Sequence, residues 1–216
     1  MQPSPPEPAI PPDLLAGQQL PPPPQQERSR RKRAALLQSA LALFGERGYE
    51  ETSIEDIARQ AGVAVGGFYK YFASKRQILL VLMDRLVQEA AAVAETVELN
   101  ISTRQEIRES IAQLARQALL VDWAYAGAHH AWREAATRDR ELQALYQQIE
   151  AWVVQRLRLY FWVLLSLPGA RQEVDRETLA WEIALLFLRL AETPLPDPDP
   201  IVASLTDLIY HGLFTG

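Results

Sequence analysis

The chain has 216 residues, no cysteine and a formal net charge of −5 at pH 7. This length allows a small domain and a larger one, each with its own core. The lack of cysteine excludes disulfides and thiolate chemistry. Charged residues interrupt every long apolar run, and the amino terminus lacks the features of a signal peptide, so we expect a cytoplasmic protein that does not enter membranes.

The charge is unevenly distributed along the chain. Residues 28–86 contain 11 lysines and arginines against 6 acidic residues, whereas residues 87–216 contain 11 against 18. All lysines of the protein, Lys32, Lys70 and Lys75, lie in the basic part. This asymmetry indicates that the basic part binds a polyanion such as nucleic acid.

Residues 1–27 are rich in proline and glutamine, with four consecutive prolines at 21–24. They contain too few apolar side chains to bury a core, which predicts a disordered or polyproline-like arm. We favour a simple tether. Alternatively, the arm extends contact with nucleic acid through the basic run that follows it.

A long helix is expected from Ala34 to about Gly48. A basic run leads into it: Arg28, Arg30, Arg31, Lys32 and Arg33. We select Arg31 and Arg33 as candidate contacts to backbone phosphates or to a minor groove. The alternative is a solvated charge run.

Two short helices joined by a turn are expected within residues 52–75. Ile54, Ile57, Ala58 and Ala61 recur at helical spacing. Thr52 and Glu55 have the spacing of a capping box at the start of the first helix, and Gly62 ends it. The second helix has its inward side chains at Val65, Phe68 and Phe72. A helix, a glycine turn and a second helix make a helix-turn-helix.

The outer face of the second helix suits a DNA major groove. Gly66 and Gly67 let the backbone approach closely, and Lys70 can reach a phosphate or a guanine edge. Tyr69 and Tyr71 offer hydroxyls to phosphate oxygens. The alternatives are that Lys70 is a solvated surface lysine and that Tyr69 only packs.

Another capping box, Ser74 with Gln77, opens the next helix. Lys75 lies in its first turn, where a positive charge opposes the helix dipole. We interpret Lys75 as a candidate phosphate contact at this helix end. The alternative is again a solvated lysine.

These residues resemble the TetR family of bacterial transcriptional regulators. The matching positions, strong over about residues 30–86, are Thr52, Ile57-Ala58, Ala61-Gly62-Val63, Gly66, Tyr69, Phe72 and Ser74-Lys75. The resemblance implies that a first set lies at the DNA surface, namely Thr52, Gly66, Tyr69, Tyr71 and Lys75. It implies that a second set tunes sequence choice, namely Val65, Gly67 and Lys70. Ala64 departs from the family, which usually has a capping serine or threonine there.

The rest of the chain is expected to be helical, which predicts an all-α protein. Further helices are expected at about 75–98, 103–120, 126–137, 140–167, 173–192 and 201–213. We therefore predict three parts: the arm (1–27), a three-helix helix-turn-helix domain (28–76) and a helical ligand-binding and dimerisation domain (77–216). The resemblance implies a homodimer through the last two long helices, which suits a palindromic operator on double-stranded DNA.

Aromatic residues are concentrated in the carboxy-terminal part, which contains all five tryptophans. As candidate contacts to a small lipophilic effector we select Trp123, His129, Trp132, Tyr160 and Trp181. The alternative is that these residues belong to the core or to the dimer interface. His129, His130 and Glu134 give only a weak metal signal, so we expect neither a metal nor a cofactor. Nothing has the pattern of a nucleophile with its base or of a phosphate loop, so we expect no enzyme.

We therefore expect a ligand-responsive DNA-binding regulator, more precisely a repressor released from its operator by a lipophilic small molecule. The effector could be a drug-like cation, a fatty acyl compound or another hydrophobic metabolite. One alternative is that the carboxy-terminal domain recruits a protein partner. Another is that it is catalytic and the helix-turn-helix localises it.

Overall fold

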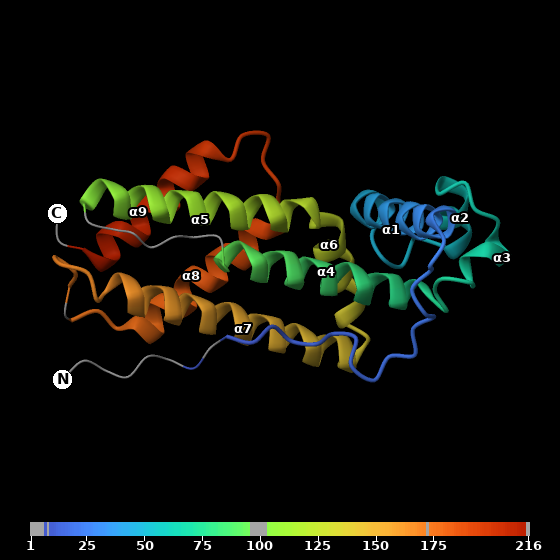
Figure 1. The fold of residues 1–216 in the computed structure, drawn as a ribbon, viewed down its shortest axis with the longest axis horizontal. Coiled ribbons are helices and arrows are strands. Elements are labelled where there is room, and N and C mark those ends of the chain that lie inside the picture. Colours follow the sequence, from blue (N-terminus) through green and yellow to red (C-terminus); the bar gives the residue numbers. More distant parts are fainter. Residues whose placement is uncertain (1–6, 8, 96–102, 172, 215–216) are drawn as a thin grey trace. The chain divides into compact units, whose positions relative to one another are not determined.

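The computed structural model describes residues 7, 9–95, 103–171 and 173–214, which form helices joined by connections (Figure 1). Among these residues the β pairing is limited to one isolated bridge between Ala170 and Phe214. The helices are α1 (Glu27–Arg47), α2 (Ile54–Gln60), α3 (Val65–Phe68), α4 (Lys75–Glu95), α5 (Arg104–Ala124), α6 (Ala126–Ala136), α7 (Arg140–Leu164), α8 (Arg176–Ala191) and α9 (Asp199–Leu213). The predicted all-α class is confirmed. The end of α4 expected near Glu98 lies outside the described residues.

The described residues divide into two compact units, a helix-turn-helix unit and a larger unit. The first takes residues 13–87 and 125–146, and the second takes 88–124, 147–214 and the described residues up to 12. The helix-turn-helix unit is thus discontinuous in sequence and includes α6. The domain boundary expected between residues 76 and 77 stays a prediction.

Helix α1 begins at Glu27, so the basic run belongs to the helix and does not precede it. Its apolar face is buried through Leu36, Leu37, Ala40, Leu43 and Phe44. These positions recur at three- and four-residue spacing, as on one face of a helix. Gly48 ends the helix with a φ of +85°, and its N–H donates to the Phe44 carbonyl at 3.0 Å.

Helix α2 is capped one residue later than the sequence suggests. The N-cap is Ser53, whose Oγ accepts from the Asp56 N–H at 3.0 Å and donates to the Asp56 carboxylate at 2.7 Å. The predicted capping box of Thr52 with Glu55 is therefore wrong. Both pairs have the same spacing and suitable residue types, so the local pattern does not distinguish them.

Helix α6 packs against α1 inside the helix-turn-helix unit, where Gly127 meets the α1 backbone (Figure 1). A Cβ added to Gly127 would lie 2.1 Å from the Leu41 carbonyl oxygen and 2.9 Å from the Gly45 nitrogen. Distances this short leave no room for any side chain. The two helix backbones therefore approach as closely as only glycine permits.

Polar side chains of α6 bind the carboxy-terminal end of α1 and the loop after it. The His130 Nδ1 lies 3.2 Å from the Phe44 carbonyl oxygen. The Glu134 carboxylate accepts from the N–H of Tyr49 at 2.6 Å and from the N–H of Glu50 at 3.2 Å. Because Tyr49 and Glu50 follow the end of α1, Glu134 satisfies two donors that have no partner in the helix.

Asp139 joins the start of α7 to α4. One of its oxygens accepts from the N–H groups of Glu141 at 3.0 Å and Leu142 at 3.1 Å. The other accepts from the Arg76 Nε at 2.7 Å. The hydrogen bond from Arg76 is the largest cause holding the pKa of Asp139 below its ordinary value, and burial opposes it.

Replacing Asp139 with asparagine is expected to remove a pH-dependent part of the stability. The pKa of Asp139 is lower in the folded protein than in the unfolded chain, where it is about 3.9. The carboxylate therefore stabilises the fold above about pH 4, and this contribution is lost as the pH falls further. Thermal unfolding at several pH values should show the gap between wild type and D139N shrinking below about pH 4. Asparagine can still cap α7, so a gap that does not change with pH would contradict this prediction.

The described part of the amino-terminal arm makes specific contacts in both units. In the helix-turn-helix unit, Leu14 is 1% exposed. There Gln18 donates to the Glu141 carboxylate at 2.9 Å, and the Gln77 side chain donates to the Gln19 carbonyl at 2.9 Å. We expected the arm to be disordered, and from residue 9 the structure differs from this expectation. Side chains of α4 and α7 bind main-chain and polar groups of the arm there. Residues 1–6 and 8 of the predicted arm lie outside the described residues.

The larger unit has an apolar interior made by α5, α7, α8 and α9, with α5 lying against α9 (Figure 1). Its main buried cluster consists of Ile107, Ile111, Val154, Phe161, Leu164, Ala180, Ile183, Ala184, Ile209, Tyr210, Leu213 and Phe214. A smaller cluster contains Leu119, Val202 and Leu205. Among the residues that the structure describes, no helix has the length and apolar character needed to cross a bilayer.

Candidate nucleic-acid interface

Two phenylalanines fix the end of the helix-turn-helix in the core. Phe68 and Phe72 are both 0% exposed. The Phe68 carbonyl accepts from the N–H of Tyr71 at 2.9 Å and of Phe72 at 3.1 Å. The chain therefore keeps a helical course for a turn beyond the end of α3. This course turns Tyr69 and Lys70 outward, as the sequence suggests.

The outward residues of α3 form an exposed surface. Val65 is 38% exposed and Tyr69 53% exposed. The expectation that Val65 faces inward is wrong, whereas its place beside the DNA-facing residues stays a prediction. A Cβ added to Gly66 would meet nothing within 4 Å, so the open space at this glycine is available to a partner.

A hollow of about 360 Å³ lies between α1 and the α3 region. Its lining residues are Arg28, Ser29, Lys32, Val63, Gly67, Lys70 and Tyr71. Three of them carry a positive charge, namely Arg28, Lys32 and Lys70. None of the three has an acidic side chain within ion-pair distance among the described residues. These charges are therefore free to bind phosphate.

The two arginines selected from the basic run differ in their surroundings. Arg31 is exposed and its Nε donates to Glu27 at 2.9 Å. Arg33 stacks on Phe72, with its guanidinium carbon 5.1 Å from the ring centroid. Burial, followed by the charge of Arg85, lowers the pKa of Arg33. Arg33 is thus used in packing, which differs from the expected contact to DNA.

Arg28 and Lys32 line the hollow but were not selected from the sequence. They are one helical turn apart, so they lie on the same face of α1. The four-residue spacing of Arg28 and Lys32 can be read from the sequence. It indicates a shared helix face only if the helix begins at Glu27, whereas we expected the helix to begin at Ala34.

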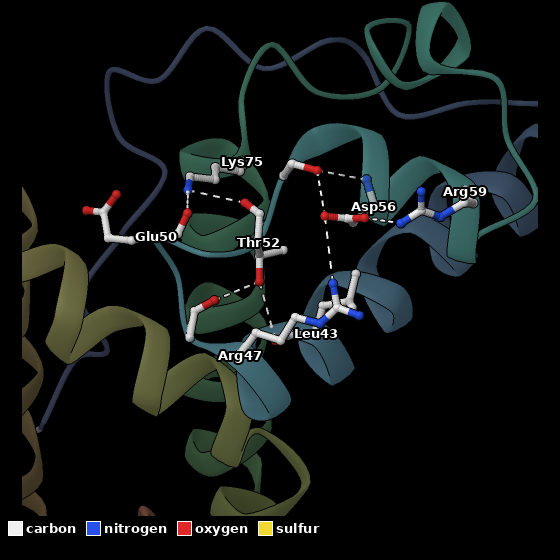
Figure 2. A network of polar contacts seen from close by, with 9 residues as sticks. Leu43, Arg47, Glu50, Thr52, Asp56, Arg59 and Lys75 are labelled. Carbon is white, nitrogen blue, oxygen red and sulfur yellow. Dashed lines mark hydrogen bonds and ion pairs between the residues drawn. The ribbon is translucent and has the colours of Figure 1, made fainter.

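Thr52 and Lys75 bind main-chain carbonyls at the end of α1 and in the loop after it (Figure 2). Thr52 is 0% exposed, and its hydroxyl donates to the Gly48 carbonyl at 2.6 Å. The Lys75 Nζ donates to the carbonyls of Tyr49 at 2.6 Å, Glu50 at 3.2 Å and Thr52 at 3.2 Å. It also lies 4.3 Å from the centroid of the Tyr49 ring. All three N–H groups of the ammonium are used, so Lys75 and Thr52 differ from the expected contacts to DNA.

The start of α3 lacks a side-chain cap, as expected from Ala64. Ala64 is the N-cap residue with φ −63° and ψ 146°, and no side chain accepts from the first turn. Replacing Ala64 with serine is expected to stabilise the protein by about 0.5–2 kcal/mol, because its hydroxyl can accept from that turn. Thermal unfolding measures this gain. An unchanged or lower melting temperature would contradict it, and A64V, which also lacks an oxygen and is a poor N-cap, serves as the control.

The five candidate effector contacts are divided between the two units. Trp123, Tyr160 and Trp181 lie in the larger unit, whereas His129 and Trp132 lie in the helix-turn-helix unit. Trp132 is 0% exposed and its Nε1 donates to the Leu142 carbonyl at 3.2 Å, as in a packed core. Trp181 is 44% exposed on α8. Their contacts with an effector stay predictions.

Two of the residues on α6 that suggested a metal have a structural role. His130 and Glu134 bind main-chain groups of α1 and its loop. Within the described ranges there is no group of three or more histidine, cysteine or acidic residues placed to hold a metal ion.

The comparisons with known proteins agree on one family. Residues 36–82 match the model of the bacterial regulatory proteins of the tetR family. The transcriptional regulator EthR of Mycobacterium tuberculosis is 27% identical over 183 residues, which cover 82% of each chain.

Solved structures of similar fold include two ligand complexes. A transcriptional regulator from Saccharomonospora viridis in complex with choline has a TM-score of 0.65 and 23% identity, and covers 85% of this chain and 98% of its own. AibR in complex with isovaleryl coenzyme A and operator DNA has a TM-score of 0.62 and 23% identity, with the same coverage. At this identity the likeness concerns the fold.

Proposed function

Because the chain belongs to the TetR family of bacterial transcriptional regulators, we propose that it is a DNA-binding repressor that a small lipophilic molecule releases from its operator. The observation that carries the DNA-binding part is the hollow with Arg28, Lys32 and Lys70. Phosphates bind these cations and position the exposed face of α3 at the bases. The open space at Gly66 admits the DNA at close range.

The effector part of this proposal rests on family relationship and on the connection between α5 and α6. The structural neighbours named above were solved with choline and with isovaleryl coenzyme A. A single residue, Tyr125, separates the end of α5 from the start of α6. We therefore expect a ligand-dependent shift of α5 to move α6, which is held to α1 by Gly127, His130 and Glu134. The factor by which the effector lowers DNA affinity equals the ratio of its affinities for the DNA-free and the DNA-bound protein.

A homodimer through α8 and α9 fits the exposed apolar side chains of these helices. Trp181, Leu185, Leu186 and Leu208 are 39–58% exposed. Large apolar side chains gathered on adjacent elements mark an interaction surface. A twofold dimer presents two helix-turn-helix units to a palindromic operator.

Sequencing of captured DNA tests the repressor proposal directly. The full-length protein is incubated with fragmented genomic DNA from its host, and the retained fragments are sequenced. We expect a few palindromic sites, and compounds that release these fragments from the folded protein are effectors. Retention without sequence preference, lost as salt rises, would contradict a specific repressor.

The apolar surface on α8 and α9 also suits a different protein, which is the second candidate function. In that case the carboxy-terminal part recruits a partner in place of a second copy. Sedimentation of the purified protein separates the two. A stable dimer with operator sites supports the repressor, and a monomer at micromolar concentration favours recruitment.

A further inference from the structure

Two side chains of α7 in the larger unit bind the main chain of the amino-terminal arm. The Gln155 Nε2 donates to the Glu7 carbonyl at 2.9 Å, and the Trp152 Nε1 donates to the Ala9 carbonyl at 3.3 Å. The arm runs beside α7 there (Figure 1). Both donors lie on one face of α7, because they are three residues apart. This face, with Trp152 and Gln155, is called the carbonyl-binding face below.

Two arginines of α7 orient these donors. The guanidinium carbon of Arg156 lies over the Trp152 ring, 4.6 Å from its centroid. The Arg158 Nη1 donates to the Gln155 Oε1 at 3.3 Å, which directs the amide NH₂ group of that glutamine to the arm. Arg158 in turn forms an ion pair with Glu177 on α8. The donors are therefore held in place by side chains of the larger unit itself.

The spacing of the donors suits alternate carbonyls of an extended chain. Side chains three positions apart on a helix have Cβ atoms about 5–6 Å apart. An extended or polyproline-like chain rises about 3.1–3.4 Å per residue, so its carbonyls two residues apart are separated by roughly 6–7 Å. The two distances agree, and Glu7 and Ala9 are two residues apart. A helix would not offer such carbonyls, since its own N–H groups bind them.

The bound segment has the composition of a polyproline-like chain. Residues 8, 11 and 12 of the arm are prolines, which have no N–H group. Such a segment offers carbonyl acceptors and brings few donors that need partners. Its fixed φ angles also reduce the conformational entropy lost on binding. Proline-rich segments commonly dock on aromatic side chains for this reason, and Trp152 is the aromatic residue of this face.

The side chains of the arm contribute little to this contact. Ile10, the largest apolar side chain of residues 7–12, is 79% exposed. Ala9, Pro11 and Pro12 are only half-buried. Both hydrogen bonds go to main-chain oxygens, which every residue has. The contact therefore does not select the sequence of the arm, and another proline-rich segment can make the same hydrogen bonds.

We propose that the carbonyl-binding face is a docking site for an extended, proline-rich segment of another protein, and that the arm occupies it until that partner binds. The arm is then a competitor built into the chain. Its effective concentration at the site is high, so a partner must bind more tightly than the arm or be present in excess. A second copy offers only an identical arm, whereas another protein can add contacts of its own. This site goes beyond the proposed function and uses α7, not the exposed apolar side chains of α8 and α9.

A fluorescent label on the arm of the full-length protein reports whether the face is occupied. The chain has no cysteine, so I10C gives a single site for a bimane label at an exposed position. Tryptophan quenches bimane on contact, and the docked arm should therefore be dark. W152F should restore the fluorescence. Q155A, which keeps the quencher, should raise the ratio of undocked to docked arm by about 2–10-fold, since one hydrogen bond is lost. A label unaffected by both substitutions would overturn the proposal.

Peptides added to the labelled protein test the docking site. The probes are APPAPPAPPA, a peptide with the sequence of residues 3–13, and ASSASSASSA, in which serine replaces every proline of the first. Both proline-rich peptides should displace the arm and restore the fluorescence. The serine peptide should need at least about tenfold higher concentration. Equal displacement by the serine peptide, displacement by the arm's own sequence alone, or no displacement at all would overturn the proposal.

Dilution of the labelled protein identifies the source of the bound arm. Quenching that does not depend on protein concentration supports an arm bound within its own chain. Quenching that is lost on dilution would show that a second copy supplies the arm. The face would then join copies of this chain, and the proposal of another protein as partner would fail.

Discussion

Replacing Gly127 with alanine is expected to destabilise the protein by more than about 3 kcal/mol, the largest effect of any substitution considered for this chain. The added Cβ would lie 2.1 Å from the Leu41 carbonyl oxygen and 2.9 Å from the Gly45 nitrogen. These are backbone atoms of α1, so no side-chain rotation relieves the clash. Either α6 must move away from α1 or α1 must deform. Thermal unfolding measures the loss, which corresponds to roughly 10 °C for a chain of this size.

Gly212 provides a matched control for G127A. It also lies in a helix, α9, but a Cβ added there would meet only methyl groups of Leu179 at 3.8 Å, an ordinary contact. G212A should be neutral or stabilising by up to about 1 kcal/mol, because alanine favours helix more than glycine does. If G127A melts like G212A, the close approach of α1 and α6 does not exist in solution.

The lysines Lys70 and Lys75 are expected to give opposite results when each is replaced with alanine. K75A should lose about 2–3 kcal/mol of stability, because three carbonyls lose a charged donor and Tyr49 loses a cation over its ring. K70A should leave stability within about 0.5 kcal/mol, since Lys70 is exposed. Its operator affinity should fall at least about tenfold.

Two measurements on the same pair of variants separate these roles. Thermal unfolding should lower the melting temperature of K75A by roughly 4–12 °C and leave K70A unchanged. The dependence of operator affinity on salt should weaken by about one unit of slope in K70A, because one phosphate contact is lost. A stable K75A with weakened DNA binding would restore the interpretation of Lys75 as a phosphate contact.

Patterns confined to a few neighbouring residues were enough to predict the fold class and the buried side of the helix-turn-helix. The spacing of Phe68 and Phe72 predicts which side of the helix-turn-helix is buried, and both residues are in the core. Gly62 ends its helix with a φ of +64°, and Ala64 leaves α3 uncapped. In each case the determining contact lies within one helical turn, where the order of residues fixes the geometry.

The structure departs from our expectations where the determining contact comes from elsewhere in the chain. In the sequence Lys75 has the pattern of a surface lysine, whereas in the structure it binds the loop at Tyr49. Arg33 has no partner near it in the sequence, whereas in the structure it stacks on Phe72. His130 and Glu134 suggest a metal in isolation, yet they bind main-chain atoms of α1. No local pattern contains these partners, because folding brings them together from positions far apart.

The contacts of α6 with α1 also set the order in which the protein can be made. The helix-turn-helix unit consists of residues 125–146 as well as residues 13–87. During synthesis the first segment leaves the ribosome while Gly127 and Glu134 have yet to be added. The nascent chain therefore cannot complete its DNA-reading unit until α5 and α6 have emerged, so a prematurely terminated chain that contains the whole helix-turn-helix motif should still be unable to occupy the operator.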